Sequence, residues 1–251
     1  MKLPERIIQK SIAMKSLFTT VALFVALVAT AQTKTYNDPN AKERTLSGSF
    51  TKISIASGVE LYLTQGNENA LAVSMNDSKY DERFKTEVEN GTLKIWYDNK
   101  NWSAGDKNRK LKAYVSYKTL ESLICSSGSN TKLTNTLNAG NLNLNFSSGC
   151  VFSGAINAAE VNTTASSGAM VTISGKAGKL TVSANSGANF KGADLITSYC
   201  TASANSGAAI KIEVQKELNA SANSGGEIKY TGPAVLNKGS INSGGSVKQG
   251  S

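Results

Sequence analysis

Ser-Gly dipeptides recur at a nearly constant spacing through the second half of the chain. They are Ser127-Gly128, Ser148-Gly149, Ser167-Gly168, Ser186-Gly187, Ser206-Gly207, Ser224-Gly225 and Ser243-Gly244. Successive glycines lie 21, 19, 19, 20, 18 and 19 residues apart. Self-similarity at a fixed period near twenty residues is typical of a solenoid, in which each repeat contacts only its neighbours. The spacing therefore predicts a stack of short, similar structural units.

Residues at odd distances from each glycine are mostly apolar or small, and most of those between them are polar. Seven residues before the glycine stand Leu142, Val161, Leu180, Cys200 and Leu218. Three residues after it stand Thr131, Phe152, Val171, Phe190, Ile210, Ile228 and Val247. Period-two alternation predicts strands with one buried face. The fold prediction is all-β: a single-stranded parallel β-helix of about seven to eight rungs of 18–21 residues.

The Ser-Gly dipeptide is interpreted as the corner of each rung. Glycine supplies turn dihedral angles that a side chain disfavours, and the predicted structural corner residues are Gly128, Gly149, Gly168, Gly187, Gly207, Gly225 and Gly244. The position before the dipeptide holds serine in three repeats and then Asn185, Asn205, Asn223 and Asn242, whose stacked amides can bond along the axis. A row of serine nucleophiles is the competing interpretation, but a catalytic residue need not recur seven times.

Upstream of the regular repeats, Ser57-Gly58 obeys the same rule and predicts a first rung over residues 50–64. The interval that follows predicts inserted strands at 71–75, 85–88, 93–97 and 111–117, the middle two joined as a hairpin by Asn90-Gly91. We therefore divide the domain 50–251 into an N-terminal part with inserted strands, 50–118, and regular rungs, 119–251. The last rung has polar inward positions, so it either caps the solenoid or docks a partner chain, which allows a homo-oligomer through this end.

The N-terminus predicts export. Lys15 precedes an apolar run over 17–28 and the small-x-small site Ala29-Thr30-Ala31, the pattern of a secretory signal peptide. Residues 1–31 are assigned to it, with 1–13 coming from an upstream start codon, and 32–49 form an N-terminal extension. The run is short for a bilayer span, although a membrane anchor is the alternative. Localisation in the periplasm or at the cell surface follows, with membrane contact only through the signal peptide.

Charge and cysteine content restrict the partners and the redox chemistry. The formal charge of +9 includes four basic residues and one acidic residue within 1–31, and the lysines are scattered singly along the chain. A nucleic-acid footprint needs a basic stripe and usually stacking aromatics, so no nucleic-acid partner is expected. Cys125, Cys150 and Cys200 fall at inward positions and are expected to be free, buried thiols.

The signal peptide, the opening Phe50-Thr-Lys-Ile-Ser-Ile-Ala-Ser-Gly-Val-Glu-Leu, the Asn-Gly hairpin and the Ser-Gly rungs together resemble a known family. It is the head GIN domain family of bacterial envelope proteins, common in Bacteroidetes and associated with autotransporter adhesins. The resemblance extends from about Phe50 to the C-terminus. It implies a β-helix at the cell surface or in the periplasm, acting in adhesion and without an enzymatic role.

The chain contains few candidate catalytic residues. There is no histidine, which removes Ser-His-Asp catalysis and histidine-ligated metal sites. Glu160 and Glu217 share a column but are three rungs, about 14 Å, apart, beyond the carboxylate pair of a glycosidase. Glu213 and Glu217 can meet across a corner, so a carbohydrate-active lyase or hydrolase is the alternative function. We expect no cofactor and no metal.

A binding module is the leading hypothesis. Trp96, Tyr97 and Trp102 bracket a polar loop, and exposed aromatic rings beside amides suit sugar rings. The opposing interpretation makes Trp96 a core strand residue and Trp102 a loop plug. The function predicted is an exported, non-enzymatic adhesion or interaction module for a glycan or a surface protein, with contacts at this loop or along a flat face of Thr, Ser, Asn and Lys. A purely structural envelope component is a third hypothesis.

Overall fold

The computed structural model describes residues 36–100 and 108–250, which belong to one compact unit. The predicted signal peptide lies outside these residues. The N-terminal elements are β1 (Lys42–Glu43), β2 (Lys52–Ile55), β3 (Glu60–Gln65), β4 (Ala70–Met75), the 3-10 helix η1 (Ser78–Arg83), β5 (Phe84–Glu89), β6 (Thr92–Tyr97) and β7 (Leu111–Tyr117). Within the described residues, no helix is long and apolar enough to span a bilayer.

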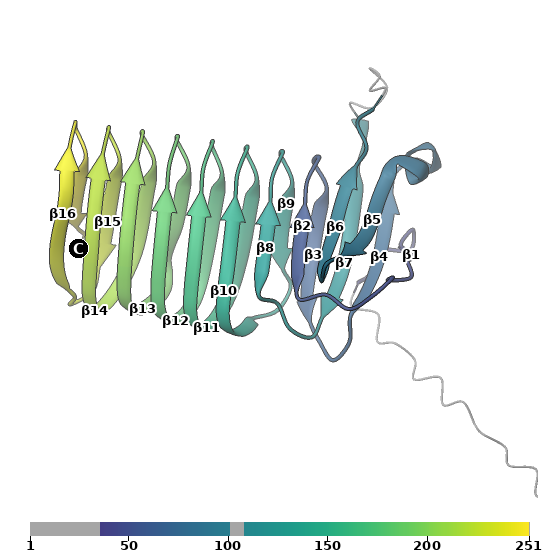
Figure 1. The fold of residues 1–251 in the computed structure, drawn as a ribbon, viewed down its shortest axis with the longest axis horizontal. Coiled ribbons are helices and arrows are strands. Elements are labelled where there is room, and N and C mark those ends of the chain that lie inside the picture. Colours follow the sequence, from purple (N-terminus) through teal and green to yellow (C-terminus); the bar gives the residue numbers. More distant parts are fainter. Residues whose placement is uncertain (1–35, 101–107, 251) are drawn as a thin grey trace, which may run out of the picture. The chain divides into compact units, whose positions relative to one another are not determined.

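The regular rungs follow with one Ser-Gly corner each (Figure 1). Their strands are β8 (Ser122–Cys125), β9 (Asn130–Leu133), β10 (Leu137–Phe146), β11 (Val151–Ala165), β12 (Met170–Ala184), β13 (Asn189–Asn205), β14 (Ala209–Asn223), β15 (Glu227–Thr231), β16 (Val235–Asn242) and β17 (Ser246–Gln249). Each pairs in parallel with the strand one rung away, as Leu142 with Val161 and Val161 with Leu180. The predicted parallel β-helix is confirmed.

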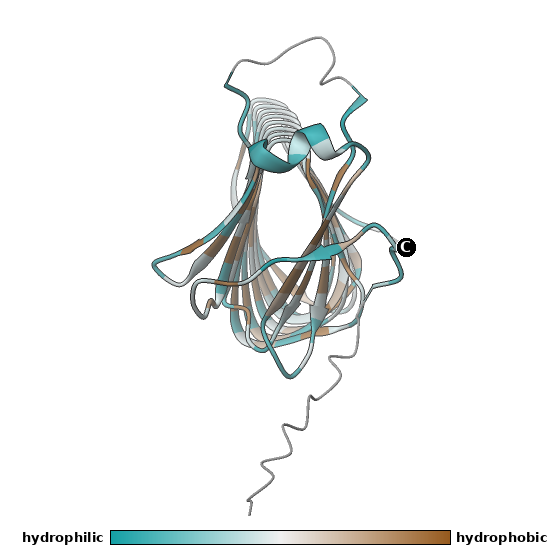
Figure 2. Ribbon diagram, turned by 90° about the vertical axis from the view of Figure 1, so that its right-hand side faces the viewer, coloured by the Kyte–Doolittle hydropathy of each residue, from teal (hydrophilic) through white to brown (hydrophobic). Residues whose placement is uncertain are grey.

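The corners form one row of tight turns, superposed when viewed along the stack (Figure 2). Both central residues have positive φ, as in Ser186 (52°) and Gly187 (72°), and the N–H after them donates to the carbonyl before them, Ala188 to Asn185 at 3.1 Å. This is the pattern of a type I′ turn. From Gly128 to Gly225, each corner glycine N–H also donates to the serine carbonyl of the next rung, at 2.9 Å from Gly128 to Ser148. The predicted corner is confirmed, and the serine shares its left-handed backbone.

The inward columns form one continuous core. Side chains three residues before and three residues after each glycine are buried along the regular rungs up to β15, including Phe146 and Phe152. Those seven residues before the glycine are buried from Leu142 to Leu218. Burying such a side chain stabilises the fold by about 1.5–3 kcal/mol, repeated in every rung. Cys125, Cys150 and Cys200 are free and buried in this core, as predicted.

The rungs are not stacked in sequence order. β2 pairs in parallel with β8 on one side, Ile55 opposite Cys125, and with β6 on the other, Ile55 opposite Ile95. β3 likewise lies between β9 and β7. The Ser57-Gly58 rung is therefore second in space, and the strands predicted as an insertion supply the rung outside it. The predicted Asn-Gly hairpin is confirmed as the antiparallel pair of β5 and β6.

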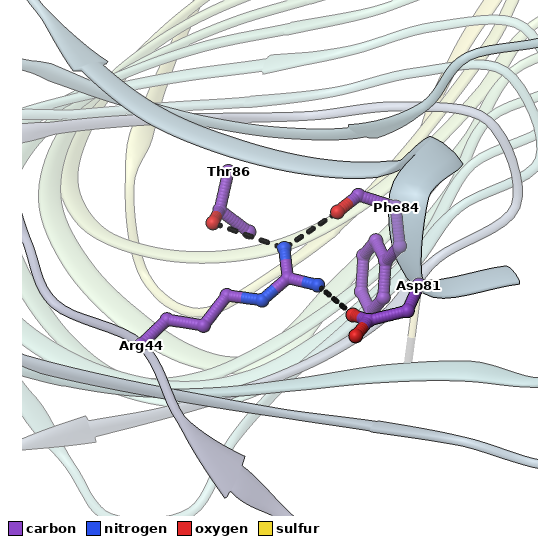
Figure 3. Close-up of polar contacts among 4 residues, drawn as sticks. All are labelled: Arg44, Asp81, Phe84 and Thr86. Carbon is purple, nitrogen blue, oxygen red and sulfur yellow. Dashed lines mark hydrogen bonds and ion pairs between the residues drawn. The ribbon is translucent and has the colours of Figure 1, made fainter. Parts of the chain in front are cut away.

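Antiparallel strands close the N-terminal end of the stack. We call this end the cap. β5 pairs with β6, β4 with β7, and β1 with β4. Arg44 fastens this end, because its guanidinium donates to the Asp81 carboxylate at 2.7 Å, the Phe84 carbonyl at 2.5 Å and the Thr86 hydroxyl at 3.2 Å (Figure 3). Residues 36–49, the described part of the predicted N-terminal extension, belong to the same compact unit as the strands.

Arg109 takes the place of a corner glycine next to the Ser57-Gly58 corner, because the described residues form no further Ser-Gly corner on that side. Its guanidinium donates to the Ser57 carbonyl at 2.9 Å, the acceptor that receives a glycine N–H in later rungs. The same guanidinium lies 3.9 Å from the centroid of the Tyr97 ring. One side chain thus satisfies the first carbonyl of the ladder and ties it to the core of the cap.

Candidate ligand-binding face

Two adjacent outward columns carry only hydroxyl and amide side chains over five consecutive rungs. Six residues before the glycine stand Asn143, Asn162, Thr181, Thr201 and Asn219, and four residues before it stand Asn145, Thr164, Ser183, Ser203 and Ser221. All are exposed or half-buried, and each column is in register across β10 to β14. We call these residues the polar face. Strand spacing repeats its donors and acceptors about every 4.8 Å, so it offers a rigid array to a repetitive ligand.

An asparagine ladder borders the polar face on the corner side. The Asn205 amide donates to the Asn185 carbonyl oxygen at 3.2 Å, and the Asn223 amide to that of Asn205 at 3.3 Å. The amides of Asn185 and Asn205 also donate to Ser183 and Ser203 in the polar face. The predicted bonding between stacked amides is present in these rungs. It holds the side chains along this edge in fixed rotamers, which lowers the entropy lost on binding.

Three carboxylates of the regular rungs, those considered for catalysis, contact neighbouring side chains. Glu160 makes an ion pair with Lys179 at 3.4 Å. Glu213 accepts from the Gln215 amide at 2.8 Å, and Glu217 accepts at 3.0 Å from the amide of Asn237. Across residues 36–100 and 108–250, no three acidic or cysteine side chains are grouped as a metal site requires.

Two residues of the predicted aromatic site, Trp96 and Tyr97, point to opposite faces of β6. Tyr97 is 1% exposed. The guanidinium groups of Arg83 and Arg109 lie 4.6 and 3.9 Å from the centroid of its ring. Its prediction as a sugar-stacking residue is wrong, because the inward position in β6 places the ring in the core. Trp96 faces outward beside Lys85 of β5 and is half-buried. Trp102 lies outside the described residues.

A stack of tyrosine rings near the N-terminal end was not foreseen as a unit. Tyr114 lies between Tyr62 and Tyr36, with ring centroids 5.2 and 4.9 Å away. The Tyr62 hydroxyl donates to Glu60 at 2.7 Å, which raises the pKa of Tyr62 to about 12. Burial and the hydrogen bond to Asp38 raise the pKa of Tyr114. Tyr62 stands four residues after Gly58, so its outward column was visible in the sequence, but its pairing with Tyr114 depends on rung order.

A shallow cavity adjoins the tyrosine stack. Its volume is about 350 Å³, and Asp38, Ser74, Asn76, Lys112 and Tyr114 are among its lining residues. The Tyr114 hydroxyl donates to Asp38 at 2.8 Å, and Asp38 also accepts from the backbone N–H of Asn40. These bonds give the N-terminal segment a fixed place on the outer surface of β7.

The chain is similar to one family by sequence. The family model described as "Putative auto-transporter adhesin, head GIN domain" matches residues 49–234. No curated protein matches the chain.

Solved structures share the fold at low sequence identity. A putative adhesin from Bacteroides fragilis superposes with a TM-score of 0.74 at 17% identity, over 83% of this chain and 95% of that one. A putative adhesin from Parabacteroides merdae gives 0.67 at 13%, over 86% and 98%. A protein from Parabacteroides distasonis described as a putative lipid binding protein gives 0.61 at 17%, over 84% and 96%.

Proposed function

Because the chain belongs to the head GIN domain family, we propose that it is an exported, non-enzymatic solenoid that serves as an adhesion or interaction module of the bacterial cell envelope. The polar face is the observation that carries this proposal. Hydroxyl and amide groups repeated in register on rigid strands can bind sugar hydroxyls or an extended peptide through many weak hydrogen bonds. Such a surface recognises a repetitive ligand without moving.

The carboxylates support binding over catalysis. A glycosidase needs a free acid and base at a fixed separation, whereas Glu160, Glu213 and Glu217 each engage a neighbouring side chain. No observation on the described residues favours the carbohydrate-active enzyme. The partner we propose for the polar face is a glycan or a protein at the surface of a cell or matrix.

The experiment compares two tyrosine-substituted proteins with wild type on an array of glycans and matrix proteins. Thr181→Tyr with Thr201→Tyr blocks the centre of the polar face, and both side chains point outward. Asn130→Tyr with Met170→Tyr places the same bulk on exposed positions of the strands after the corner, outside the polar face. Tyrosine suits exposed strand positions, so both variants are expected to fold. We expect the first variant to lose array binding and the second to keep it.

Localisation is checked by adding protease to intact cells. Cleavage of the protein at the cell surface supports adhesion to an external ligand. A protein that remains protected on intact cells and binds nothing on the array contradicts the proposed function.

Trp102 and Trp96 are proposed as a separate contact at the N-terminal end. The Trp102→Ala variant on the same array tests this loop, and binding equal to wild type removes it as a contact. Tyr97 is buried, so Tyr97→Ala is expected to destabilise the N-terminal end of the stack and is unsuitable as a binding test.

The C-terminal rung is the proposed place of any self-association. Asn237 and Gly239 of β16 are exposed, and Val235 is 66% exposed. Lys238 and Lys248 also lie on these last strands, and lysine on an edge strand opposes pairing with another chain. Sedimentation over a range of protein concentrations tests the predicted homo-oligomer, which a constant monomer mass contradicts.

A further inference from the structure

Lysines that are scattered along the sequence form a straight column on the outer surface of the last rungs. Lys191, Lys211, Lys229 and Lys248 each stand four residues after a corner glycine. They pair in register from β13 to β14, β14 to β15 and β15 to β17. All four are exposed. We call them the lysine column, and at the spacing of paired strands it is roughly 14 Å long.

Like charges directly opposite each other on a sheet are destabilising, and the fold avoids them elsewhere. The column eight residues before each glycine holds Glu160, Lys179, Tyr199 and Glu217 in successive rungs. There Glu160 pairs with the oppositely charged Lys179 at 3.4 Å, and the neutral Tyr199 separates Lys179 from Glu217. The lysine column has the same geometry without this compensation. Folding alone therefore gives no reason for four adjacent positive charges.

Few carboxylates neutralise the column from within the chain. Glu227 makes an ion pair with Lys229 at 3.1 Å. In the described structure, Lys191, Lys211 and Lys248 make no ion pair within 4.0 Å. Glu213 lies two residues after Lys211, but its carboxylate accepts from Gln215. Asp194 follows Lys191 by three residues, beyond the register shift between β12 and β13. The ammonium groups of Lys191, Lys211 and Lys248 can therefore meet charges from outside the chain.

We propose that the lysine column binds a linear acidic polysaccharide of the polyuronate class, lying along the solenoid axis with successive carboxylates against successive lysines. The proposal rests on the proposed function and names a partner class for it. The same column continues toward the N-terminus as Thr172, Ser153 and Lys132, then Tyr62 and Tyr114, in register throughout. The column therefore presents mainly hydroxyl groups on the N-terminal side of the four lysines, and these groups can bond the hydroxyls of further sugar units.

The geometry favours a polysaccharide over a nucleic acid. Duplex phosphates wind around a helix axis, whereas the column is one straight row. Single strands are held by aromatic side chains on which bases stack, and the column has none beside its four lysines. Lysine also acts as a point charge rather than a bidentate fork, which suits one carboxylate per sugar.

The experiment measures binding of sodium polygalacturonate to the immobilised protein, with neutral dextran as the reference polymer. The column variant changes Lys191, Lys211, Lys229 and Lys248 to glutamine. A matched control makes the same change at four exposed lysines outside the column, Lys42, Lys52, Lys85 and Lys118. Both variants lose the same formal charge. A third protein, Glu227→Gln, frees Lys229 from its internal partner.

Because an exposed ion pair contributes a factor of about 1.4 to 5, four of them predict a weakening of about fourfold to several hundredfold in the column variant. We expect the control to stay within about twofold of wild type and Glu227→Gln to bind more tightly. Added salt is expected to weaken wild-type binding steeply and column-variant binding little, because fewer counterions are released.

Three results overturn the inference. The first is no wild-type binding to polygalacturonate at low salt. The second is equal weakening of the column and control variants, which indicates net charge alone. The third is tighter binding to a DNA duplex than to polygalacturonate at the same salt. Array binding through the polar face without polygalacturonate binding leaves the proposed function standing. If binding to polygalacturonate depends on the lysine column but the protein is protected from protease on intact cells, the inference is supported and adhesion at the cell surface is contradicted.

Discussion

Replacing corner glycines by alanine tests whether the Ser-Gly row reports backbone geometry. Gly187 has φ +72°, and a Cβ built on it would meet no atom within 4 Å. Gly140, in β10, is equally open, and its φ lies outside the left-handed region. Gly187→Ala and Gly140→Ala therefore differ in backbone strain and share the absence of steric contact. Gly175 adds the steric term, because its Cβ would lie 2.0 Å from the Ile156 carbonyl oxygen at φ +107°.

The expected order follows from separating these terms. Gly-to-Ala replacement at a compatible site stabilises by about 0.4–1 kcal/mol through the unfolded chain, which is the expectation for Gly140→Ala. A left-handed alanine costs about 1–2 kcal/mol, so Gly187→Ala is expected to be net destabilising by about 1 kcal/mol. The unfolded-state term cancels between the two, so their difference of about 1–2 kcal/mol measures the strain. For Gly175→Ala we expect a loss of about 3 kcal/mol or more, because backbone must move.

Urea unfolding followed by far-ultraviolet circular dichroism measures these differences from the transition midpoint and the slope m. Solenoids can lose cooperativity between repeats, so variants are compared only where m is unchanged. Equal midpoints for Gly187→Ala and Gly140→Ala would refute the strain argument. A larger loss in Gly187→Ala than in Gly175→Ala would refute the steric ranking.

Three further predictions concern the cap, the core and the tyrosine stack. Arg109→Gln removes the charged donor to the Ser57 carbonyl and is expected to lower the stability of the cap by about 1–2 kcal/mol, seen as earlier loss of tryptophan fluorescence in urea; an unchanged midpoint contradicts it. Burial raises the pKa of Cys200 from 9.0 to about 12, so its stabilising contribution is complete below about pH 9 and is lost as pH rises toward 12. A thiol reagent at pH 8.5 should accordingly label the unfolded chain much faster than the native one. Glu60→Gln should lower the pKa of Tyr62 from about 12, measured from phenolate absorbance, and an unchanged titration argues against the hydrogen bond.

Much of the fold could be predicted because the position of a residue relative to the corner glycine shows whether its side chain points inward or outward. Offsets from the glycine separate inward from outward residues, which identifies Leu142, Phe146 and Cys125 as core and Gly187 as a corner. The same offsets contain the lysine column, but an outward position becomes informative only when neighbouring rungs are compared. Tyr97 was misplaced because its aromatic neighbours suggested a loop, whereas its alternation with Leu93 and Ile95 already marked it as inward.

The order of the N-terminal rungs could not be predicted in this way. The alternation in β2 and β6 shows which side chains point inward, but it carries no information about which strand lies beside which. Long chain segments can leave the stack and return at small entropic cost, since closure entropy grows only slowly with loop length. This freedom allows β6 and β7 to form the rung outside the one that precedes them in sequence.

The sequence by itself determined the rung, its corner and its buried face, because period-two alternation and left-handed turns are local properties of the chain. Only the tertiary structure decided which rungs are neighbours, that Arg109 supplies the donor missing before Ser57, and that Tyr97 lies beneath two guanidinium groups. It also decided that isolated lysines share one line, since charge–charge proximity depends on the pairing of strands about 20 residues apart. Local chemistry specified the repeating unit, and non-local pairing arranged those units into surfaces.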